Sequence, residues 1–149
     1  MHARLCLYAH ECPNFQSGHM ETPCIRFKCI QCCLDTEMLL LNEDIERIEG
    51  LGFDRSYFVS NIDGWLKLKN RGGRCVFNDG KKCLIYENRP EGCKSYPIIY
   101  DEDRNCATID EDCPHGDEFK MTKIEMELAI SIAKKLKDER RKRKLLSLR

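Results

Sequence analysis

The chain has 149 residues, the length of one domain with a modest hydrophobic core. Its formal net charge is zero, 42% of its residues are hydrophobic and 34% are charged. No stretch is long and apolar enough for a membrane span or for the core of a signal peptide. We therefore expect a cytoplasmic protein without membrane contact.

Residues 1–19 differ in character from the rest of the chain. The run from Asn14 to Met20 reads Asn-Phe-Gln-Ser-Gly-His-Met, which resembles the remnant of a cleavable expression tag. A natural disordered arm is the alternative. Both interpretations leave Cys6 and Cys12 without a native function. The remaining chain is expected to divide into a cysteine-rich domain at residues 20–117 and a helix at residues 118–149.

A short helix is predicted after the first cysteines. Asn42 is expected to cap it, because its side chain can accept hydrogen bonds from the free amides of the first turn. Ile45 and Ile48 form its inward face, and Gly50 or Gly52 ends it.

Short strands are predicted between this helix and residue 117. Pro90 is expected to open a brief helix that carries Cys93 and that Pro97 ends. Apolar alternation and turn residues predict strands at Tyr57–Val59, Trp65–Lys69, Arg74–Phe77, Cys83–Tyr86, Ile98–Tyr100 and Ala107–Ile109.

A long amphipathic helix is predicted from about residue 118 to residue 146. Its end is strongly basic, with nine Lys or Arg residues against two carboxylates between Lys134 and Arg149. The segment Lys134–Lys144 could bind the phosphates of nucleic acid. Helix tails of this composition are commonly solvated, however, and no aromatic neighbours support base stacking. The expected apolar stripe of the helix is Ile124, Leu128, Ile132 and Leu136, flanked by Met121, Ala129 and Ala133.

Eight of the eleven cysteines fall into two sets of four. Disulfides are one interpretation, but clustered cysteines in a chain without an export signal favour metal binding. Adjacent side chains diverge, so Cys32 and Cys33 are expected to serve different metal centres, or one binds metal while the other packs beside it. The predicted metal ligands are Cys24, Cys29, Cys32, Cys33, Cys75, Cys83, Cys93 and Cys113.

The cysteine spacing bears on which metal is bound. Thiolate is a soft ligand that selects zinc, copper(I) or iron–sulfur clusters. Paired zinc sites usually show C-x2-C twice, whereas here only Cys29 and Cys32 have that spacing. This asymmetry favours an iron–sulfur centre over a zinc site that only stabilises the fold. We expect Cys29 and Cys32 to share a centre with part of the segment from Cys75 to Cys93. The predicted fold is α+β, a small metal-centred domain with short antiparallel hairpins and a long C-terminal helix.

Four runs of sequence carry a resemblance to a known family: Phe27–Cys33, Gly73–Phe77, Cys83–Pro97 and Asp112–Pro114. Together they resemble the YkgJ-type cysteine cluster family, which is described as a zinc- or iron-chelating domain. Some larger relatives are flagellin lysine N-methylases in which this module holds a 4Fe-4S cluster. The resemblance therefore implies a 4Fe-4S type centre. The methylase activity is not carried over, because no G-x-G-x-x-G motif opens a helix here.

The chain departs from the family pattern at the first cysteine. The family has C-x2-C-x2-C-C, whereas the first gap here is C-x4-C and Arg26 stands where a cysteine is expected. Either Cys24 substitutes through a shifted loop, or the first site has three thiolates and an open coordination position.

Tyr86 and Arg89 are candidate cofactor-binding residues because they flank Cys83 and Cys93. They could donate hydrogen bonds to cluster sulfurs or hold an anionic substrate. The alternative is that Arg89 pairs with a neighbouring glutamate in a turn. His115 is expected to be a surface residue rather than a ligand.

The sequence predicts a metal-binding cysteine cluster protein with a redox or accessory role in a modification reaction. Its partner would be a protein or a small molecule. The alternative is a zinc-stabilised module that binds nucleic acid or a protein through its basic helix. No cysteine or serine is placed with a histidine that could activate it, so the sequence does not decide whether the protein is an enzyme.

Overall fold

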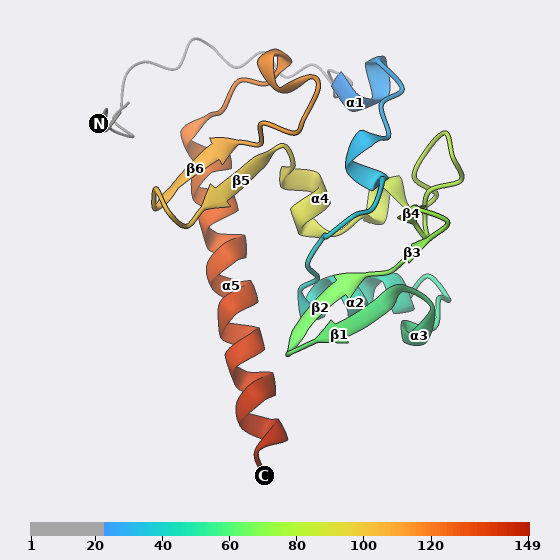
Figure 1. The fold of residues 1–149 in the computed structure, drawn as a ribbon, viewed down its shortest axis with the longest axis vertical. Helices are drawn as coiled ribbons and strands as arrows, with labels where there is room; N and C mark the ends of the chain where they lie inside the picture. The colour runs from blue at the N-terminus through green and yellow to red at the C-terminus, as the bar shows by residue number, and fades with distance from the viewer. Residues whose placement is uncertain (1–22) are drawn as a thin grey trace.

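The computed structural model describes residues 23–149 and shows an α+β fold, as predicted. The predicted tag remnant at residues 1–19 lies outside the described residues. Figure 1 shows short elements gathered beside one long helix. The helices are α1 (Pro23–Arg26), α2 (Asn42–Glu49), α3 (Arg55–Phe58), α4 (Glu91–Ser95) and α5 (Lys123–Ser147). Three 3₁₀ turns are η1 (Gln31–Cys33), η2 (Tyr86–Asn88) and η3 (Gly116–Glu118).

Six strands form three antiparallel hairpins. The β1–β2 hairpin pairs Val59 with Leu68 and Ile62 with Trp65. The strands are β1 (Val59–Ile62) with β2 (Trp65–Leu68), β3 (Asn70–Arg71) with β4 (Arg74–Cys75), and β5 (Ile98–Asp101) with β6 (Cys106–Ile109).

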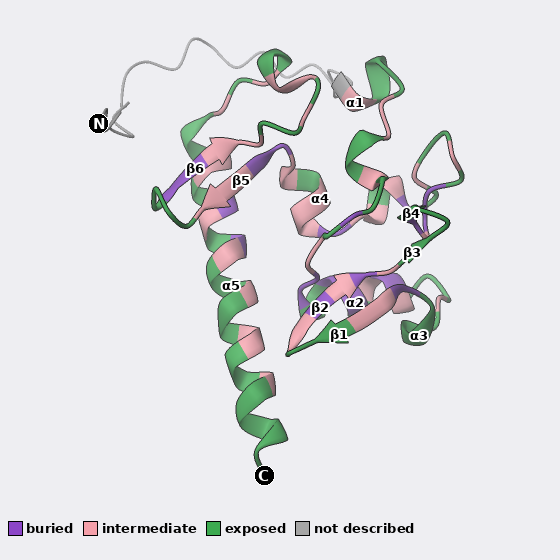
Figure 2. Cartoon of the chain, in the orientation of Figure 1, coloured by how far each residue is buried: buried purple, intermediate pink, exposed green. Residues whose placement is uncertain are grey.

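The larger core lies between α2 and the β1–β2 hairpin and continues toward the cysteines (Figure 2). Apolar side chains leave water here, which is the main favourable contribution to folding. Cys75 is a full member of this core, and Cys33, Cys83 and Cys93 pack against it. Its other buried members are Leu40, Ile45, Ile48, Phe58, Leu66, Leu68, Phe77 and Ile85.

A smaller core joins α5 to the β5–β6 hairpin. Its buried residues are Ile98, Ala107 and Ala129. The predicted stripe of α5 is wrong in its first half, because Ile124 is 78% exposed and Leu128 is 43% exposed. Ile132 of the predicted stripe and its expected flank Ala129 are buried, because the helix can approach the hairpin closely where a side chain is small.

Several predicted boundaries are corrected. Leu41, not Asn42, is the cap of α2, and the Asp44 carboxylate accepts from its N–H. Tyr57 belongs to the helical turn α3 rather than to a strand. The predicted strand at Cys83–Tyr86 is reduced to a single bridge at Cys83 followed by η2. Helix α5 begins at Lys123, where the Thr122 hydroxyl accepts from the Glu125 N–H.

The basic end of α5 is partly anchored to the rest of the chain. Asp63 pairs with both Arg140 and Lys144, and Arg143 donates to the Gly64 carbonyl at 2.9 Å. Six of the nine basic residues form ion pairs, namely Lys135, Lys137, Arg140, Arg141, Arg143 and Lys144. Within residues 23–149, none of the helices has the length and apolarity that a bilayer span requires.

Candidate metal centre

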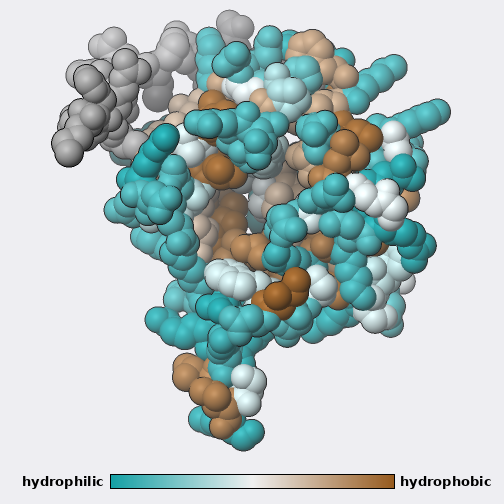
Figure 3. All heavy atoms as spheres, in the orientation of Figure 1, coloured by the Kyte–Doolittle hydropathy of each residue, from teal (hydrophilic) through white to brown (hydrophobic). Residues whose placement is uncertain are grey.

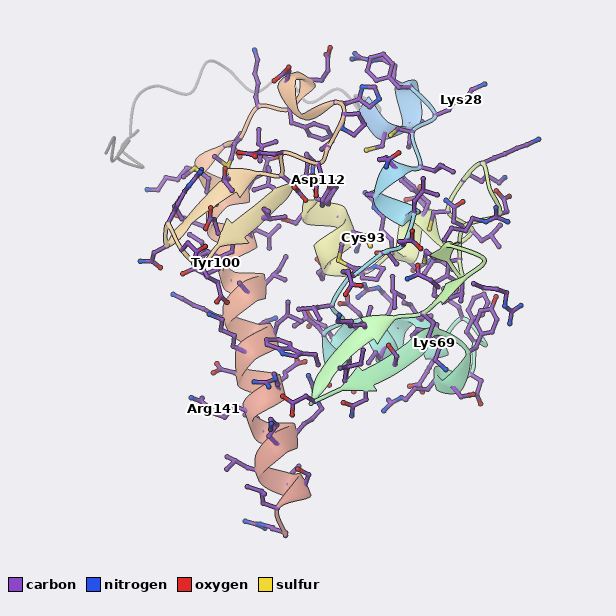
Figure 4. The ribbon with its side chains drawn as sticks, in the orientation of Figure 1. Lys28, Lys69, Cys93, Tyr100, Asp112 and Arg141 are labelled. Carbon is purple, nitrogen blue, oxygen red and sulfur yellow. The ribbon has the colours of Figure 1, made fainter. Side chains whose placement is uncertain are left out.

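Four cysteines from separate segments meet at the edge of the larger core, and we call Cys33, Cys75, Cys83 and Cys93 the inner group. The pKa of the Cys93 thiol is raised well above its usual value, first by burial and then by the charges of the other three. Burial raises the pKa of Cys75 to about 11, with smaller contributions from Cys33 and Cys83. Such mutual effects arise only between groups that lie close together. Figure 4 labels Cys93 on α4, near the middle of the molecule.

Local backbone structure brings the inner group together around β4. Gly72 and Gly73 have φ of 58° and 78°, the positive values that a two-residue type I′ hairpin turn requires. Leu34 pairs with β4 through an antiparallel bridge, which places Cys33 beside the strand. A second bridge pairs Asn78 with Cys83.

Asp44 fixes α4, the helix that carries Cys93. This carboxylate is completely buried and accepts from the Leu41 N–H at 2.9 Å and from the Glu91 N–H at 2.9 Å. Arg47 donates to it at 2.8 Å. The buried charge is thus paired and hydrogen-bonded, the condition under which buried charges are tolerated. These bonds tie the start of α4 to α2.

Backbone N–H groups point at two sulfurs of the inner group. Burial raises the pKa of both Cys75 and Cys83, and a hydrogen bond from the Phe77 N–H to Cys75 partly offsets that effect. The Ile85 N–H does the same for Cys83. Hydrogen bonds of this kind favour the charged thiolate, which is the form that binds metal.

Cys32 and Cys33 share a hydrogen bond between their side chains. The Cys32 thiol donates to Cys33, which raises the pKa of Cys32 and lowers that of Cys33 to about 7. The side chain of Asn78 contributes to the lowering at Cys33. Cys33 therefore has the most readily ionised thiol of this pair.

The remaining four predicted ligands lie nearer the surface, and we call Cys24, Cys29, Cys32 and Cys113 the outer group. Burial raises the pKa of Cys24, and the charges of Cys113 and Cys29 raise it further. The charge of Cys24 also contributes to the raised pKa of Cys32. Cys32 is exposed and the other three are partly exposed. Cys32 is also linked to the inner group, because its thiol donates a hydrogen bond to Cys33 and the charge of Cys93 raises its pKa further. The expectation that Cys29 and Cys32 share a centre with part of Cys75–Cys93 stays a prediction.

Arg89 lies between the two groups. Its charge lowers the pKa of Cys24 and of Cys83, against the larger raising effect of burial. The guanidinium lies 3.9 Å from the centroid of the Tyr86 ring and donates to the Tyr86 carbonyl at 2.6 Å. No ion pair joins it to a neighbouring glutamate in the described part of the chain. His115 stacks on Phe27 with centroids 4.4 Å apart.

The donor set of the inner group fits a thiolate-bound metal. Its ligands are all sulfur, they are desolvated, and N–H groups point toward them. Among residues 23–149, however, no three Cys, His, Asp or Glu side chains form a group that could hold a single metal ion as they stand. A single zinc ion needs sulfurs about 2.3 Å from one point. An iron–sulfur cluster contains several metal atoms, so its cysteine sulfurs lie farther apart than those around one ion.

A cleft of about 650 Å³ opens beside the outer group. Figure 3 shows this face hollowed near its middle, with apolar side chains around the hollow. Cys32 and Tyr96 both line the cleft. The pKa of Tyr96 is raised by burial and by Asp110, and Cys113 and Cys32 contribute as well. The cleft therefore reaches Cys32 of the outer group.

Comparison with protein-family models identifies the family of this chain. Residues 23–114 match the family model CxxCxxCC, whose description reads "Putative zinc- or iron-chelating domain". The chain belongs to the CxxCxxCC family. The matched residues include both cysteine groups, and the resemblance predicted from sequence is confirmed. The searches of curated proteins and of solved structures found no match.

The departure from the CxxCxxCC pattern at Arg26 has a structural counterpart. Cys24 lies close enough to Cys29 and Cys113 for their charges to act on it. Arg26 instead forms an exposed ion pair with Glu118 at 3.0 Å. Cys24 thus lies near the other outer thiols, while the two alternatives considered from the sequence stay predictions.

Three supporting residues were not identified from the sequence. Asp44 has the pattern of a helix first-turn acid, so its link to α4 could not be read from its position. Asn78 looks like an ordinary turn residue before Asp79-Gly80. Tyr96 follows a cysteine-bearing helix, and only the folded chain shows that it lies near Cys32 and Cys113.

Proposed function

We propose that the inner group holds an iron–sulfur centre of the 4Fe-4S type and that the protein has a redox or accessory role in a modification reaction. The observation that carries this proposal is the convergence of Cys33, Cys75, Cys83 and Cys93 on one another beside the hydrophobic core. The cysteine spacing, in which C-x2-C occurs only once, supports a cluster over paired zinc sites. A bound cluster would supply one-electron transfer. The free thiols of the described chain suit a reducing compartment such as the cytoplasm.

Anaerobic purification followed by metal and sulfide analysis tests the proposal. We expect brown protein with equal amounts of iron and acid-labile sulfide. The Cys93→Ser variant should lose most of both, whereas Cys106→Ser should keep them, because Cys106 lies in β6 outside both groups. Colourless protein with stoichiometric zinc would support the alternative of a zinc-stabilised module instead.

The cleft is the proposed site of a small-molecule partner. Its walls include Ile98, Ile132 and Trp65, which suit an apolar body. Its lining is strongly acidic, with one lysine, Lys137, which pairs with a lining glutamate. Charge complementarity therefore favours an organic cation. The lining carboxylates are Asp35, Glu37, Glu102, Asp110 and Asp112.

Titration with matched probes tests the cleft. Hexylamine should shift NMR signals of cleft residues, whereas hexanoate of the same length should not. The variant Ala133→Phe places a ring in the cleft and should weaken hexylamine binding, while Ser131→Phe on the exposed face of α5 should not. Equal binding of both probes would contradict the preference for a cation.

The alternative partner of the basic helix is nucleic acid. The ion pairs of its tail favour a structural role for most of these charges. Lys134 and Lys142 are exposed and remain the best candidates for binding phosphate. If RNA binds there, changing both to glutamine should lower the slope of the salt dependence by about 1 for each phosphate-binding charge removed. An unchanged affinity would leave the tail without this role.

A further inference from the structure

Asn78 is held between ligands of the inner group. Its backbone N–H donates to the Cys75 carbonyl at 2.9 Å, and its backbone pairs with Cys83. The residue is 6% exposed. Its side-chain Oδ1 accepts from the Gly80 N–H at 2.8 Å, which closes the turn after β4.

The other end of the same side chain is the amide donor Nδ2. Nδ2 of Asn78 is fully buried and has no hydrogen-bond partner of normal geometry among the residues that the structure describes. Buried amide donors without an acceptor are rare in folded proteins because their desolvation is uncompensated. The turn bond at Oδ1 fixes the orientation of the amide, so Nδ2 cannot reach solvent by a flip without losing that bond.

An acceptor for Nδ2 is present nearby. Cys33 is close enough to Asn78 for the amide to lower the pKa of its thiol. Cys75 and Cys83 already receive backbone N–H groups. Cys33 has the Cys32 thiol as its donor, and that thiol would lose its proton if Cys32 itself bound metal. Asn78 would then be the donor that remains for Cys33.

We propose that Asn78 is a positioning residue of the inner centre, whose Nδ2 donates a hydrogen bond to the sulfur of Cys33 when metal is bound. The inference rests on the proposed metal-binding function of the inner group. A hydrogen bond to a ligating sulfur withdraws electron density from it. The bond should therefore strengthen metal retention and raise the reduction potential of an iron–sulfur centre.

Three variants separate the donor from the turn bond. Asn78→Asp keeps an oxygen for the Gly80 N–H and loses the donor. Asn78→Leu loses the donor without adding charge, and Asn78→Ser restores a smaller donor. The matched control is Asn61→Asp, because Asn61 also accepts from a glycine N–H, that of Gly64 at 2.9 Å, but is exposed and lies in β1.

The experiment measures metal affinity and midpoint potential of each anaerobically prepared full chain, with circular dichroism to verify folding. Asn78→Asp and Asn78→Leu should bind metal about 10-fold or more weakly and show a lower potential. Asn78→Ser should fall between them and wild type, and Asn61→Asp should match wild type. If Asn78→Leu does not fold, Asn78→Asp decides, since it keeps the turn.

The outcomes separate the role of Asn78 from the metal-binding function. Wild-type affinity and potential in Asn78→Asp would overturn the role of Asn78 while leaving the metal centre intact. An equal loss in Asn61→Asp would also overturn it, because the effect would then be general. A wild-type chain that holds neither iron nor zinc would overturn the proposed function and this inference together. If the bound metal is zinc, which has no redox chemistry, the metal affinities of the variants alone test the role of Asn78.

Discussion

The inner and outer groups contain the same number of cysteines but have very different support. The inner thiols pack against the larger core, and Phe77 and Ile85 donate backbone hydrogen bonds to them. Among the outer thiols, Cys24 lies on the four-residue helix α1 and Cys32 is exposed, whereas Cys75 of the inner group is buried and the other thiols of both groups are partly exposed. Rigid, desolvated ligands hold a metal tightly, whereas exposed ligands on short elements exchange it more easily.

This difference suggests a division of roles. The inner group substitutes for part of the hydrophobic core, so its metal should contribute to folding. The outer group borders the cleft through Cys32. A molecule in the cleft could therefore reach Cys32, whereas Cys75 of the inner group is buried.

The largest expected effect is the contrast between Cys93→Ser and Cys24→Ser. Cys93→Ser should remove the inner metal and lower the free energy of unfolding by several kcal/mol, because metal binding is coupled to folding. Cys24→Ser should leave the inner metal and most of the stability. Metal analysis and denaturant unfolding measure both. Equal metal and stability losses in the two variants would erase the distinction between the groups.

Asp44→Ala should have the next largest effect. It removes a completely buried carboxylate, leaves two backbone N–H groups without their acceptor and takes from Arg47 one of its partners. The expected loss in unfolding free energy is about 3–5 kcal/mol, with weaker binding of the inner metal because α4 is no longer fixed. Glu43→Ala, an exposed neighbour on α2, is the control and should change little. Wild-type stability of Asp44→Ala would refute the link from α2 to α4.

A substitution of Arg89 should affect the thiols of the inner and the outer group together. Arg89→Gln removes a positive charge that favours the thiolates of Cys24 and Cys83. Metal affinity of both groups should fall a few-fold, and Arg89→Lys should keep part of it. Competition with a chelator measures the change. A loss confined to one group would show that Arg89 belongs to that group alone.

The smallest effect is expected at Asp63, far from the proposed ligands in the β1–β2 turn. Hydrogen bonds from Lys144 and Arg140 lower the pKa of this exposed carboxylate. Because the pKa of Asp63 is lower in the folded chain, its ion pairs stabilise the fold fully above the usual pKa of an aspartate. This stabilisation is lost as the pH falls through the pKa of the folded chain. Asp63→Asn should thus be slightly less stable than wild type at neutral pH, with a gap that shrinks below about pH 4 and at high salt. Metal content should not change.

The sequence was sufficient for the parts of the fold that local signals determine. The β5–β6 hairpin, the helix carrying Cys93 and the turn at Gly72-Gly73 follow from turn residues and apolar patterns. The strand predicted at Cys83–Tyr86 is wrong, because the chain there makes a single bridge at Cys83 and then enters the turn η2. The inward face of α5 was wrong only in its first half, where Ile124 and Leu128 are exposed and the small residue Ala129 packs against the β5–β6 hairpin.

The candidate site was predictable as a set of residues but not as a grouping. Cysteine counts and the family pattern identify eight thiols, yet spacing does not say which of them meet. The geometry of adjacent side chains predicts that Cys32 and Cys33 serve different centres, or that one binds metal while the other packs beside it, and this stays a prediction. The partners of each depend on Leu34 pairing with β4 and on the anchoring of α4 by Asp44, which are long-range contacts.

X-ray absorption at the metal edge of the anaerobically purified full chain tests the central claim most directly. The account predicts iron with a first shell of sulfur alone, at about 2.3 Å, and a second shell of iron. The second shell should persist in Cys24→Ser and disappear in Cys93→Ser. A first shell containing nitrogen or oxygen, an isolated zinc ion without metal neighbours, or cysteines joined as disulfides would contradict an iron–sulfur centre on the inner group.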